Sequence, residues 1–308
     1  MATATATPPK PGSAISERLR WLHAALFGLG AALGLLACGA ESAPTTDPLV
    51  DGPVPQRVVV LGPSSAETLV WLGLESHVVG VSDYCSAPKL VDRVKVGGQL
   101  DPNLERIASL QPDLVIVQGS HPKLKEWCAQ SGIGFLSRKT QSIAGWREEV
   151  LSYGERFEIL DRCEDQLSDW DAEYGRLAVT VEASMRPRVL IVASRDPERI
   201  TRVLAAGRGS FLGELLDHVG GANFYSDHSR DYFDLAEEAL LRVKPEIIFE
   251  LGGEQSDPAR LELWRDAFSL LPAVRDGRVY GLTEDYVFLP GPRMLDTARL
   301  LRAKLNAR

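Results

Sequence analysis

Two glutamates at matching places in an internal repeat are the residues whose type and spacing suggest chemistry most clearly. Glu105 stands seven residues before Pro112, and Glu238 stands seven residues before Pro245. In each copy an acidic residue and an apolar, β-branched run follow the proline. The pattern predicts a short helix that ends before the proline and a buried strand after it. The glutamate then lies in the first helical turn, and two outward carboxylates related by a repeat suit a partner with two-fold symmetry.

Catalytic motifs are weak in this sequence. Ser86 and Lys89 match the S-x-x-K pattern of penicillin-recognising enzymes, but Pro88 lies inside the helical turn that this motif needs, and no K-T-G follows. The sequence contains no G-x-S-x-G, no H-E-x-x-H and no phosphate-binding glycine loop. We therefore expect a protein that is not an enzyme, with a hydrolase or transferase as the rival class.

The histidines and cysteines give no clear metal site. His121 and His228 fall in loops, where each is a candidate axial metal ligand, although a lone loop histidine is more often a solvated residue. The five histidines lack paired spacing, so we expect no bound metal ion and no resident cofactor. In an oxidising compartment, Cys85, Cys128 and Cys163 allow one disulfide; Cys85–Cys128 is the favoured pair, which the sequence alone does not decide.

The elements that must position these residues also recur. Arg57 and Arg188 begin similar apolar runs, and the spacing between them is nearly the same as the spacing between the two glutamates. Two elements that recur in order at one period predict an α/β protein with two similar Rossmann-like lobes and mostly parallel sheets. We expect an N-terminal lobe over residues 57–158 and a C-terminal lobe over residues 187–308.

Between these lobes, residues 159–186 show an apolar periodicity that predicts one long bridging helix, closed by Pro187. Residues 201–204 form a candidate strand that has no counterpart in the first lobe. The ligand cleft is then expected between the lobes, at the carboxyl ends of their strands.

Residues 1–38 have the form of an export signal. Arg18 and Arg20 precede an apolar run over residues 21–37, which is short for a membrane-spanning helix. The run leads into Cys38 through a segment that resembles a bacterial lipoprotein processing site, so we expect Cys38 to carry the lipid anchor; an uncleaved N-terminal anchor is the alternative. Residues 39–56 contain four prolines and form a predicted flexible tether. Either anchor places the body in the periplasm or at the outer face of the cytoplasmic membrane.

Composition excludes one class of partner. The chain carries 34 Lys and Arg against 42 Asp and Glu, a formal net charge of −8, and it has no basic stripe. This balance argues against a nucleic-acid partner. The 308 residues, 44% of them hydrophobic, are enough for two domains with substantial cores, and we expect a monomer.

Taken together, these residues resemble the helical-backbone substrate-binding proteins of ABC importers for cobalamin, ferric siderophores and haem. The resemblance covers residues 57–305. The segments on which the resemblance rests are, in order, the export signal, Asp83-Tyr84, Gly97-Gly98, Asn103 to Asp113, Ser210 to Gly221, Glu238 to Pro245, and Pro292-Arg293. Asp83-Tyr84 and the loop at residues 282–286 make the chain most similar to the cobalamin-binding members.

The resemblance implies roles for particular residues. Glu105 and Glu238 would dock onto arginines of an ABC permease dimer; the plainer interpretation is that each only stabilises its helix dipole. Tyr232 stands six residues before Glu238, where cobalamin binders carry an aromatic residue, and Gln99 holds the matching place before Glu105. The loops at strand carboxyl ends present a candidate ligand set of Ser64, Tyr84, Gln99, His121, Tyr232, Tyr286, Phe288 and Arg293.

The chemistry of this set suits a large ligand. Aromatic side chains offer a wide apolar contact area with hydroxyl groups for hydrogen bonds, as a planar or semi-planar chelate requires. Arg293 would meet a propionate, amide or phosphate group. The sequence therefore predicts capture of cobalamin or a related corrinoid for a permease, with a ferric siderophore or haem as the alternative ligand. A tethered ligand sensor is the alternative role.

Overall fold

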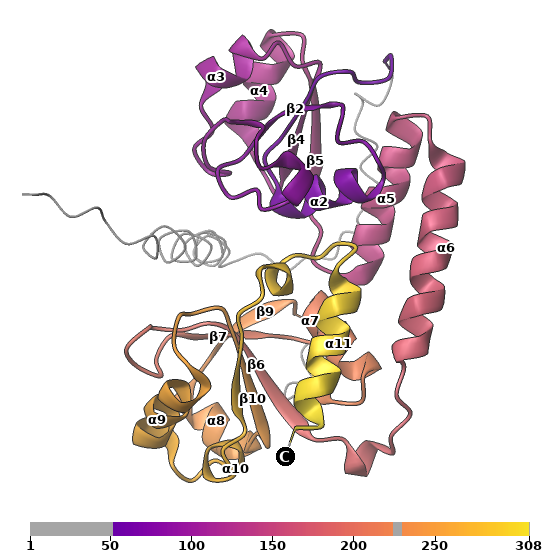
Figure 1. Ribbon diagram of the computed structural model, residues 1–308. Helices are drawn as coiled ribbons and strands as arrows, with labels where there is room; N and C mark the ends of the chain where they lie inside the picture. Colours follow the sequence, from indigo (N-terminus) through magenta and orange to yellow (C-terminus); the bar gives the residue numbers. More distant parts are fainter. Residues whose placement is uncertain (1–51, 224–229, 308) are drawn as a thin grey trace, which may run out of the picture.

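The computed structural model describes residues 52–223 and 230–307. The predicted export signal with Cys38, most of the predicted tether and His228 lie outside these residues. Two α/β lobes are stacked one above the other, and a pair of helices, α5 (Ile143–Arg156) and α6 (Leu160–Leu177), runs along one side of both (Figure 1). No helix in the described ranges is both long and apolar enough to span a membrane. The predicted two-lobed α/β fold with a bridging helix is confirmed.

The first lobe is built on a five-stranded sheet in which every strand pairing is parallel. Its order is β3-β2-β1-β4-β5, with β1 at its centre. The strands are β1 (Val58–Val60), β2 (Val78–Val81), β3 (Val94–Lys95), β4 (Leu114–Gln118) and β5 (Gly134–Arg138). The connecting helices are α2 (Pro63–Trp71), α3 (Leu104–Ser109) and α4 (Pro122–Gln130), with a 3₁₀ turn η1 (Pro88–Leu90).

The second lobe has a mixed six-stranded sheet of order β11-β10-β6-β7-β9, with β8 also paired to β6. Its strands are β6 (Arg188–Ser194), β7 (Val203–Ala206), β8 (Ala222–Asn223), β9 (Tyr232–Leu235), β10 (Ile247–Leu251) and β11 (Val279–Leu282). Its helices are α7 (Phe211–His218), α8 (Glu237–Val243), α9 (Asp257–Phe268), α10 (Pro272–Arg275) and α11 (Met294–Leu305), with 3₁₀ turns η2 (Ala183–Met185) and η3 (Asp285–Phe288). The strand expected at residues 201–204 is β7, shifted by two residues and antiparallel to β6.

The repeat found in the sequence is a repeat of structure. In both copies a short helix, α3 or α8, is followed by the proline and then by a strand, β4 or β10, that pairs in parallel with the lobe's central strand. The acidic residue after each proline makes the same kind of hydrogen bond in both lobes. Asp113 accepts the backbone N–H of Arg57 at 3.1 Å, and Glu246 accepts that of Arg188 at 2.8 Å. Each carboxylate thus satisfies a backbone donor where the central strand begins.

One hydrophobic core runs through both lobes. It joins one face of the first sheet to one face of the second through buried residues of α5 and α6, among them Trp146, Tyr153, Leu167 and Trp170. The outer face of each sheet has its own smaller core, under α3 and α4 in the first lobe and under α8, α9 and α10 in the second. The lobes are therefore joined by packed side chains and not by a flexible linker.

The bridging helix is shorter than predicted. It ends at Leu177 and not near residue 186, because Ala178 adopts an extended conformation with φ −56° and ψ 134°. The β-branched run that follows favours extended backbone over helix. Val179 donates its N–H to the His218 carbonyl at 3.0 Å, and the side chains of Val179 and Val181 pack beside Gly220.

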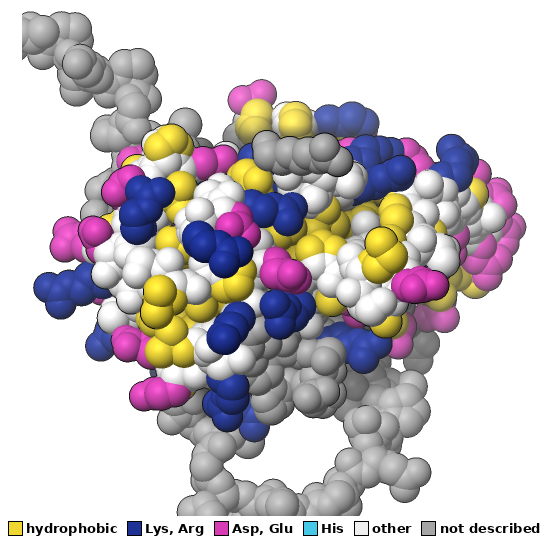
Figure 2. Space-filling view, turned by 90° about the horizontal axis from the view of Figure 1, so that it is seen from below, with side chains coloured by type: hydrophobic (Ala, Val, Ile, Leu, Met, Phe, Trp, Pro, Cys, Tyr) yellow, Lys and Arg dark blue, Asp and Glu magenta, His cyan; other side chains and the backbone are white. Residues whose placement is uncertain are grey.

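The underside of the second lobe lies at the amino ends of its parallel strands. Arg188, Glu246 and Arg278 precede or begin adjacent strands there. Seen from below, Lys and Arg side chains gather in the middle of this face among apolar ones (Figure 2). The carboxyl ends of the same strands point the other way, toward the first lobe, so the loops expected to carry function lie at the seam between the lobes.

Candidate functional site

The loops at the carboxyl ends of both sheets meet at the seam. Ser64, in the first turn of α2, is completely buried and donates a hydrogen bond to the Pro290 carbonyl of the second lobe. In this structure the Ser64 hydroxyl is used in a contact between the lobes, and its role in ligand binding stays a prediction. In a further contact, Phe211 donates its N–H to the Gln141 carbonyl at 2.7 Å.

Three of the predicted ligand residues come together in the first lobe. Gln99 Nε2 donates to the Gln118 carbonyl at 2.7 Å, and His121 Nε2 lies 3.1 Å from the same oxygen. A carbonyl only accepts, so Nε2 of His121 donates to this oxygen. Tyr84 lies against Gly98, where a Cβ atom would be 3.4 Å from its ring. Lobe one thus presents Tyr84, Gln99 and His121 as one partly exposed group.

The second lobe brings together Tyr286, Phe288 and Arg293 around η3. The Arg293 guanidinium lies over the Tyr286 ring, 5.2 Å from its centroid, and Phe288 is half-buried against the central core. Tyr232 lies apart from them, on β9 opposite Ala206, and is half-buried against the same core. The ligand set predicted for lobe two is therefore one cluster of three residues and one separate tyrosine.

The three tyrosines of the predicted set are held as neutral phenols. Burial raises the pKa of Tyr84, and the carboxylates of Asp101 and Asp83 raise it further. Burial is also the main cause of the raised pKa of Tyr232 and of Tyr286, with nearby carboxylates adding to it. At neutral pH these side chains offer hydroxyl donors and apolar ring faces.

Arg293 is already engaged by two carboxylates. Its Nε donates to Glu67 Oε2 at 3.2 Å, its Nη2 contacts Glu67 Oε1, and its Nη1 donates to Asp285 Oδ1 at 3.0 Å. Glu67 belongs to α2 of the first lobe, so this ion pair crosses the seam. Burial raises the pKa of Glu67, although Arg293 partly offsets it.

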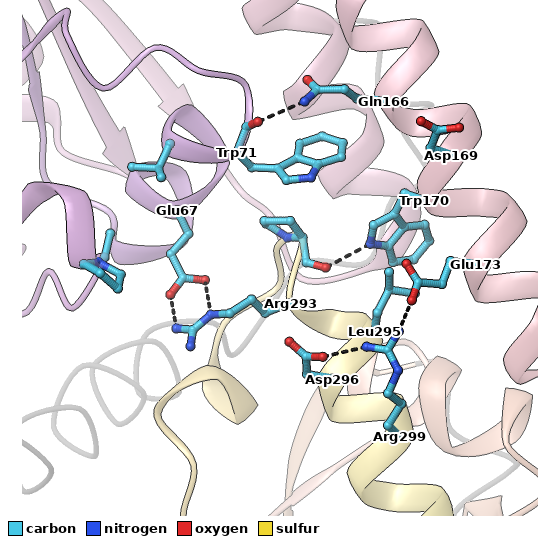
Figure 3. Close-up of a pocket in the computed structure, with 14 residues that line it drawn as sticks. Glu67, Trp71, Gln166, Asp169, Trp170, Glu173, Arg293, Leu295, Asp296 and Arg299 are labelled. Atoms are coloured by element: carbon cyan, nitrogen blue, oxygen red, sulfur yellow. Dashed lines mark hydrogen bonds and ion pairs between the residues drawn. The ribbon is translucent and has the colours of Figure 1, made fainter.

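A pocket of about 530 Å³ lies beside this ion pair, between α2, α6 and α11 (Figure 3). Of the predicted ligand residues, Arg293 alone lines it within the described part of the chain. The indole of Trp71 extends from α2 toward α6, with Trp170 and Asp169 across from it. Other lining residues include Glu67, Gln166, Glu173, Asp296 and Arg299. Sequence reasoning missed this pocket, because Trp170 has the spacing of a helix core residue and nothing in the sequence brings α2, α6 and α11 together.

The two repeated glutamates occupy equivalent, exposed positions. Glu105 is the second residue of α3, and Glu238 is the second residue of α8. Both helices lie on the side of their lobes away from α6 (Figure 1). Neither carboxylate has a hydrogen bond or ion pair within residues 52–223 and 230–307.

The favoured disulfide is absent from the described residues. Cys85, Cys128 and Cys163 are all buried free thiols. Cys85 belongs to the core shared by both lobes, whereas Cys128 belongs to the core on the other face of the first sheet. The sheet separates the two sulfurs, and the Cys85–Cys128 prediction is wrong.

In the described part of the chain, the S-x-x-K residues are not assembled as that motif requires, and no metal-ligand group is formed. Pro88 starts η1, and the Lys89 ammonium pairs with Glu75 at 2.5 Å rather than approaching Ser86. Across residues 52–223 and 230–307, no group of three or more His, Cys, Asp or Glu is placed to hold a metal ion.

Comparison with known proteins points to one family. The family model described as periplasmic binding protein matches residues 58–286. The "Uncharacterized ABC transporter substrate-binding lipoprotein YvrC" of Bacillus subtilis is 26% identical over 251 residues, which cover 79% of this chain and 77% of that protein. The "Vitamin B12-binding protein" of Vibrio cholerae is 26% identical over 263 residues, covering 82% and 90% of the two chains. The solved periplasmic haem-binding protein HutB of Vibrio cholerae matches with a TM-score of 0.70 at 17% identity, covering 82% and 99%, a likeness of fold.

Proposed function

The chain belongs to the periplasmic binding protein family, and from this premise we propose that it captures a corrinoid such as cobalamin outside the cytoplasm and delivers it to an ABC permease. In this proposal the protein is held at the membrane by a lipid on Cys38. A ferric siderophore or haem is the alternative ligand. The family binds and transports substrates, so catalysis is not part of the proposal.

The observation that carries the proposal is that the two lobes face each other with their strand carboxyl ends, where polar and aromatic side chains gather. Tyr84, Gln99 and His121 belong to one lobe, and Tyr286 and Phe288 to the other. A corrinoid has a wide apolar face bordered by amide groups, which aromatic rings and neutral hydroxyl donors suit.

The state of these side chains favours a chelate that arrives with its metal already bound. The raised pKa of Tyr84 and that of Tyr286 keep both as phenols, which are poorer metal ligands than phenolates. This feature supports recognition of the chelate's organic surface over ligation of its metal by these tyrosines.

The test is titration of the purified protein with cyanocobalamin, ferrioxamine B and haemin, followed by calorimetry and absorbance. A tight one-to-one complex with cyanocobalamin is expected. If the protein binds haemin or ferrioxamine B but not cyanocobalamin, the alternative ligand class replaces the corrinoid as the favoured ligand. Binding of none of the three would overturn the proposal.

The alternative role, a tethered sensor, predicts a different response to mutation. A transport protein loses delivery, but not ligand binding, when its docking surface is changed. A sensor that never meets the permease is indifferent to Glu105→Ala and Glu238→Ala in a transport assay.

A further inference from the structure

The pocket between α2, α6 and α11 is distinct from the strand-end surfaces proposed to hold the chelate. Tyr84, Gln99, His121, Tyr232, Tyr286 and Phe288 do not line it. The Pro292-Arg293 segment forms one of its walls and contacts α6, where Trp170 Nε1 donates to the Pro292 carbonyl at 3.0 Å (Figure 3). Its volume of about 530 Å³ is within the range of small-molecule sites.

The walls of this pocket are aromatic and aliphatic. Trp71 is partly exposed there, and the rest of the apolar lining consists of Trp170, Val70, Ala87, Leu295, Pro88 and Pro292. Trp71 is fixed from two sides. Its backbone carbonyl accepts from Gln166 Nε2 at 3.0 Å, and its ring packs against Trp146 with centroids 5.4 Å apart. A ring held in this way is a rigid contact surface for a ligand.

Among the charged side chains of the lining, acidic ones outnumber basic ones. Four carboxylates, those of Glu67, Asp169, Glu173 and Asp296, face two guanidinium groups, so the lining has a formal net charge of −2. The two arginines are already shared: Arg299 pairs with Glu173 and Asp296, and Arg293 pairs with Glu67.

Asp169 is the carboxylate of the lining that takes part in none of these ion pairs. It has no hydrogen bond or ion pair within residues 52–223 and 230–307, and it lies beyond the Trp71 ring on α6 (Figure 3). Gln166, one turn earlier on the same helix, lines the pocket too, and its buried Oε1 has no hydrogen-bond partner among the described residues. Acceptors without donors beside an indole ring favour a ligand that brings both positive charge and N–H or C–H edges.

We propose that this pocket binds an organic monocation with an apolar body, such as a protonated or quaternary amine. The cationic group lies between the Trp71 ring and the Asp169 carboxylate, where cation–π attraction and charge pairing act together. The apolar body lies against Leu295, Pro292 and Trp170. A bare metal ion is disfavoured, because the described carboxylates form no metal-binding group.

The experiment is calorimetric titration of the chain with benzyltrimethylammonium and, separately, with neutral benzyl alcohol, which shares its ring but lacks the charge. We expect saturable binding of the cation with a Kd below about 1 mM, and at least about ten-fold weaker binding of the alcohol. Asp169→Asn should weaken binding of the cation about five-fold, and Trp71→Leu more strongly. Asp165→Asn, one turn away on α6 and exposed but outside the pocket, should leave binding unchanged.

Three results overturn the inference. The first is that the cation shows no saturable binding up to 10 mM, on the order of ten times the expected Kd. The second is that the cation and the alcohol bind equally. The third is that Asp169→Asn and Asp165→Asn have equal effects on binding of the cation. Asp169→Asn is a surface change that should fold normally, which the unfolding temperature of the variant checks. Chelate titration of the same variant keeps this site separate from the proposed transport function, because Asp169→Asn should leave chelate binding intact.

Discussion

Arg293, just before α11 of the second lobe, forms a two-pronged ion pair with Glu67 on α2 of the first lobe. The Glu67 side chain is 6% exposed and that of Arg293 is 31% exposed. Ser64, one turn earlier on α2, contacts Pro290 in the same loop. Side chains from a single turn of α2 therefore hold the loop before α11 against the first lobe.

The first prediction concerns the strength of this contact. Arg293→Ala leaves a buried carboxylate without its cation, and it should lower the free energy of unfolding by about 2 kcal/mol, less than for a fully buried pair because Arg293 is partly exposed. Urea denaturation measures the change. Arg299→Ala, which breaks more exposed pairs with Glu173 and Asp296, should cost under about 1 kcal/mol. Equal losses in the two variants would contradict the prediction.

A second prediction follows from the protonation of Glu67. Its pKa in the folded protein is raised above the ordinary value of 4.5, so the folded state binds more protons at this site than the unfolded state. The stabilising contribution of the protonated form is therefore complete below pH 4.5 and is lost as the pH rises through the folded pKa. Glu67→Gln should remove this part of the pH dependence, measured as the slope of unfolding free energy against pH between about 4 and 7. An unchanged slope would refute it.

The third prediction concerns a buried cluster in the second lobe. Glu250 on β10 accepts from Arg195, Arg260 and Trp264, at 2.5, 2.8 and 2.7 Å. Burial alone would raise the pKa of Glu250, but its hydrogen bonds and the charge of Arg195 outweigh burial and lower the pKa. Glu250→Gln leaves two guanidinium groups buried without a carboxylate, and it should cost about 3 kcal/mol.

The matched control for Glu250 is Glu262→Gln, which breaks an exposed pair with Arg265 on α9 and should cost under about 0.5 kcal/mol. The pH profile gives a second measurement. A lowered carboxyl pKa contributes stability above the unfolded value, and this is lost as the pH falls through the folded pKa. The wild-type chain should therefore lose stability below pH 4.5 more steeply than Glu250→Gln does.

The sequence predicted the parts of the fold that depend on local pattern. The repeated helix, proline and strand around Glu105 and Glu238 could be predicted because proline ends a helix and a β-branched run forms a buried strand wherever they occur. The role of Asp113 and Glu246 could not. Each caps a backbone donor that is distant in the chain, and only strand pairing brings the two together.

The errors share the same cause. Apolar periodicity continued to Val181, but the helix ends at Leu177, and the side chains of Val179 and Val181 pack beside Gly220 of the second lobe. The contact of Ser64 with Pro290 of the other lobe could not be predicted for the same reason. The pocket beside Trp71 involves three helices that are distant in sequence. Contacts between distant segments decide such features, and one sequence does not reveal them.

The fourth prediction concerns the cysteines. Burial raises the pKa of Cys128 to about 12 and that of Cys163 to about 11, so little thiolate forms at pH 8. Iodoacetamide should label Cys85, Cys128 and Cys163 only after unfolding, and a reducing agent should not change the unfolding temperature. Mass spectrometry of the unreduced, unfolded protein tests the pairing directly. A mass lower by two hydrogens, with Cys85 linked to Cys128, would show that the thiols are not free.

The last prediction concerns Glu105 and Glu238. Each is the exposed second residue of a short helix, and the two helices belong to the same repeated unit of structure. Each carboxylate therefore projects from its lobe in a similar way. If they dock onto a two-fold-symmetric permease, each single alanine variant should lower ligand-stimulated ATP hydrolysis by the permease about ten-fold, and the double variant should abolish it. Binding of the chelate should be unchanged in all three variants, because neither residue lies at the seam. Glu126→Ala on α4 and Glu262→Ala on α9 remove an exposed carboxylate from each lobe outside the repeat, and both should retain full stimulation. A loss of stimulation in these controls as large as in Glu105→Ala would mean that general surface charge, and not the repeated pair, directs docking.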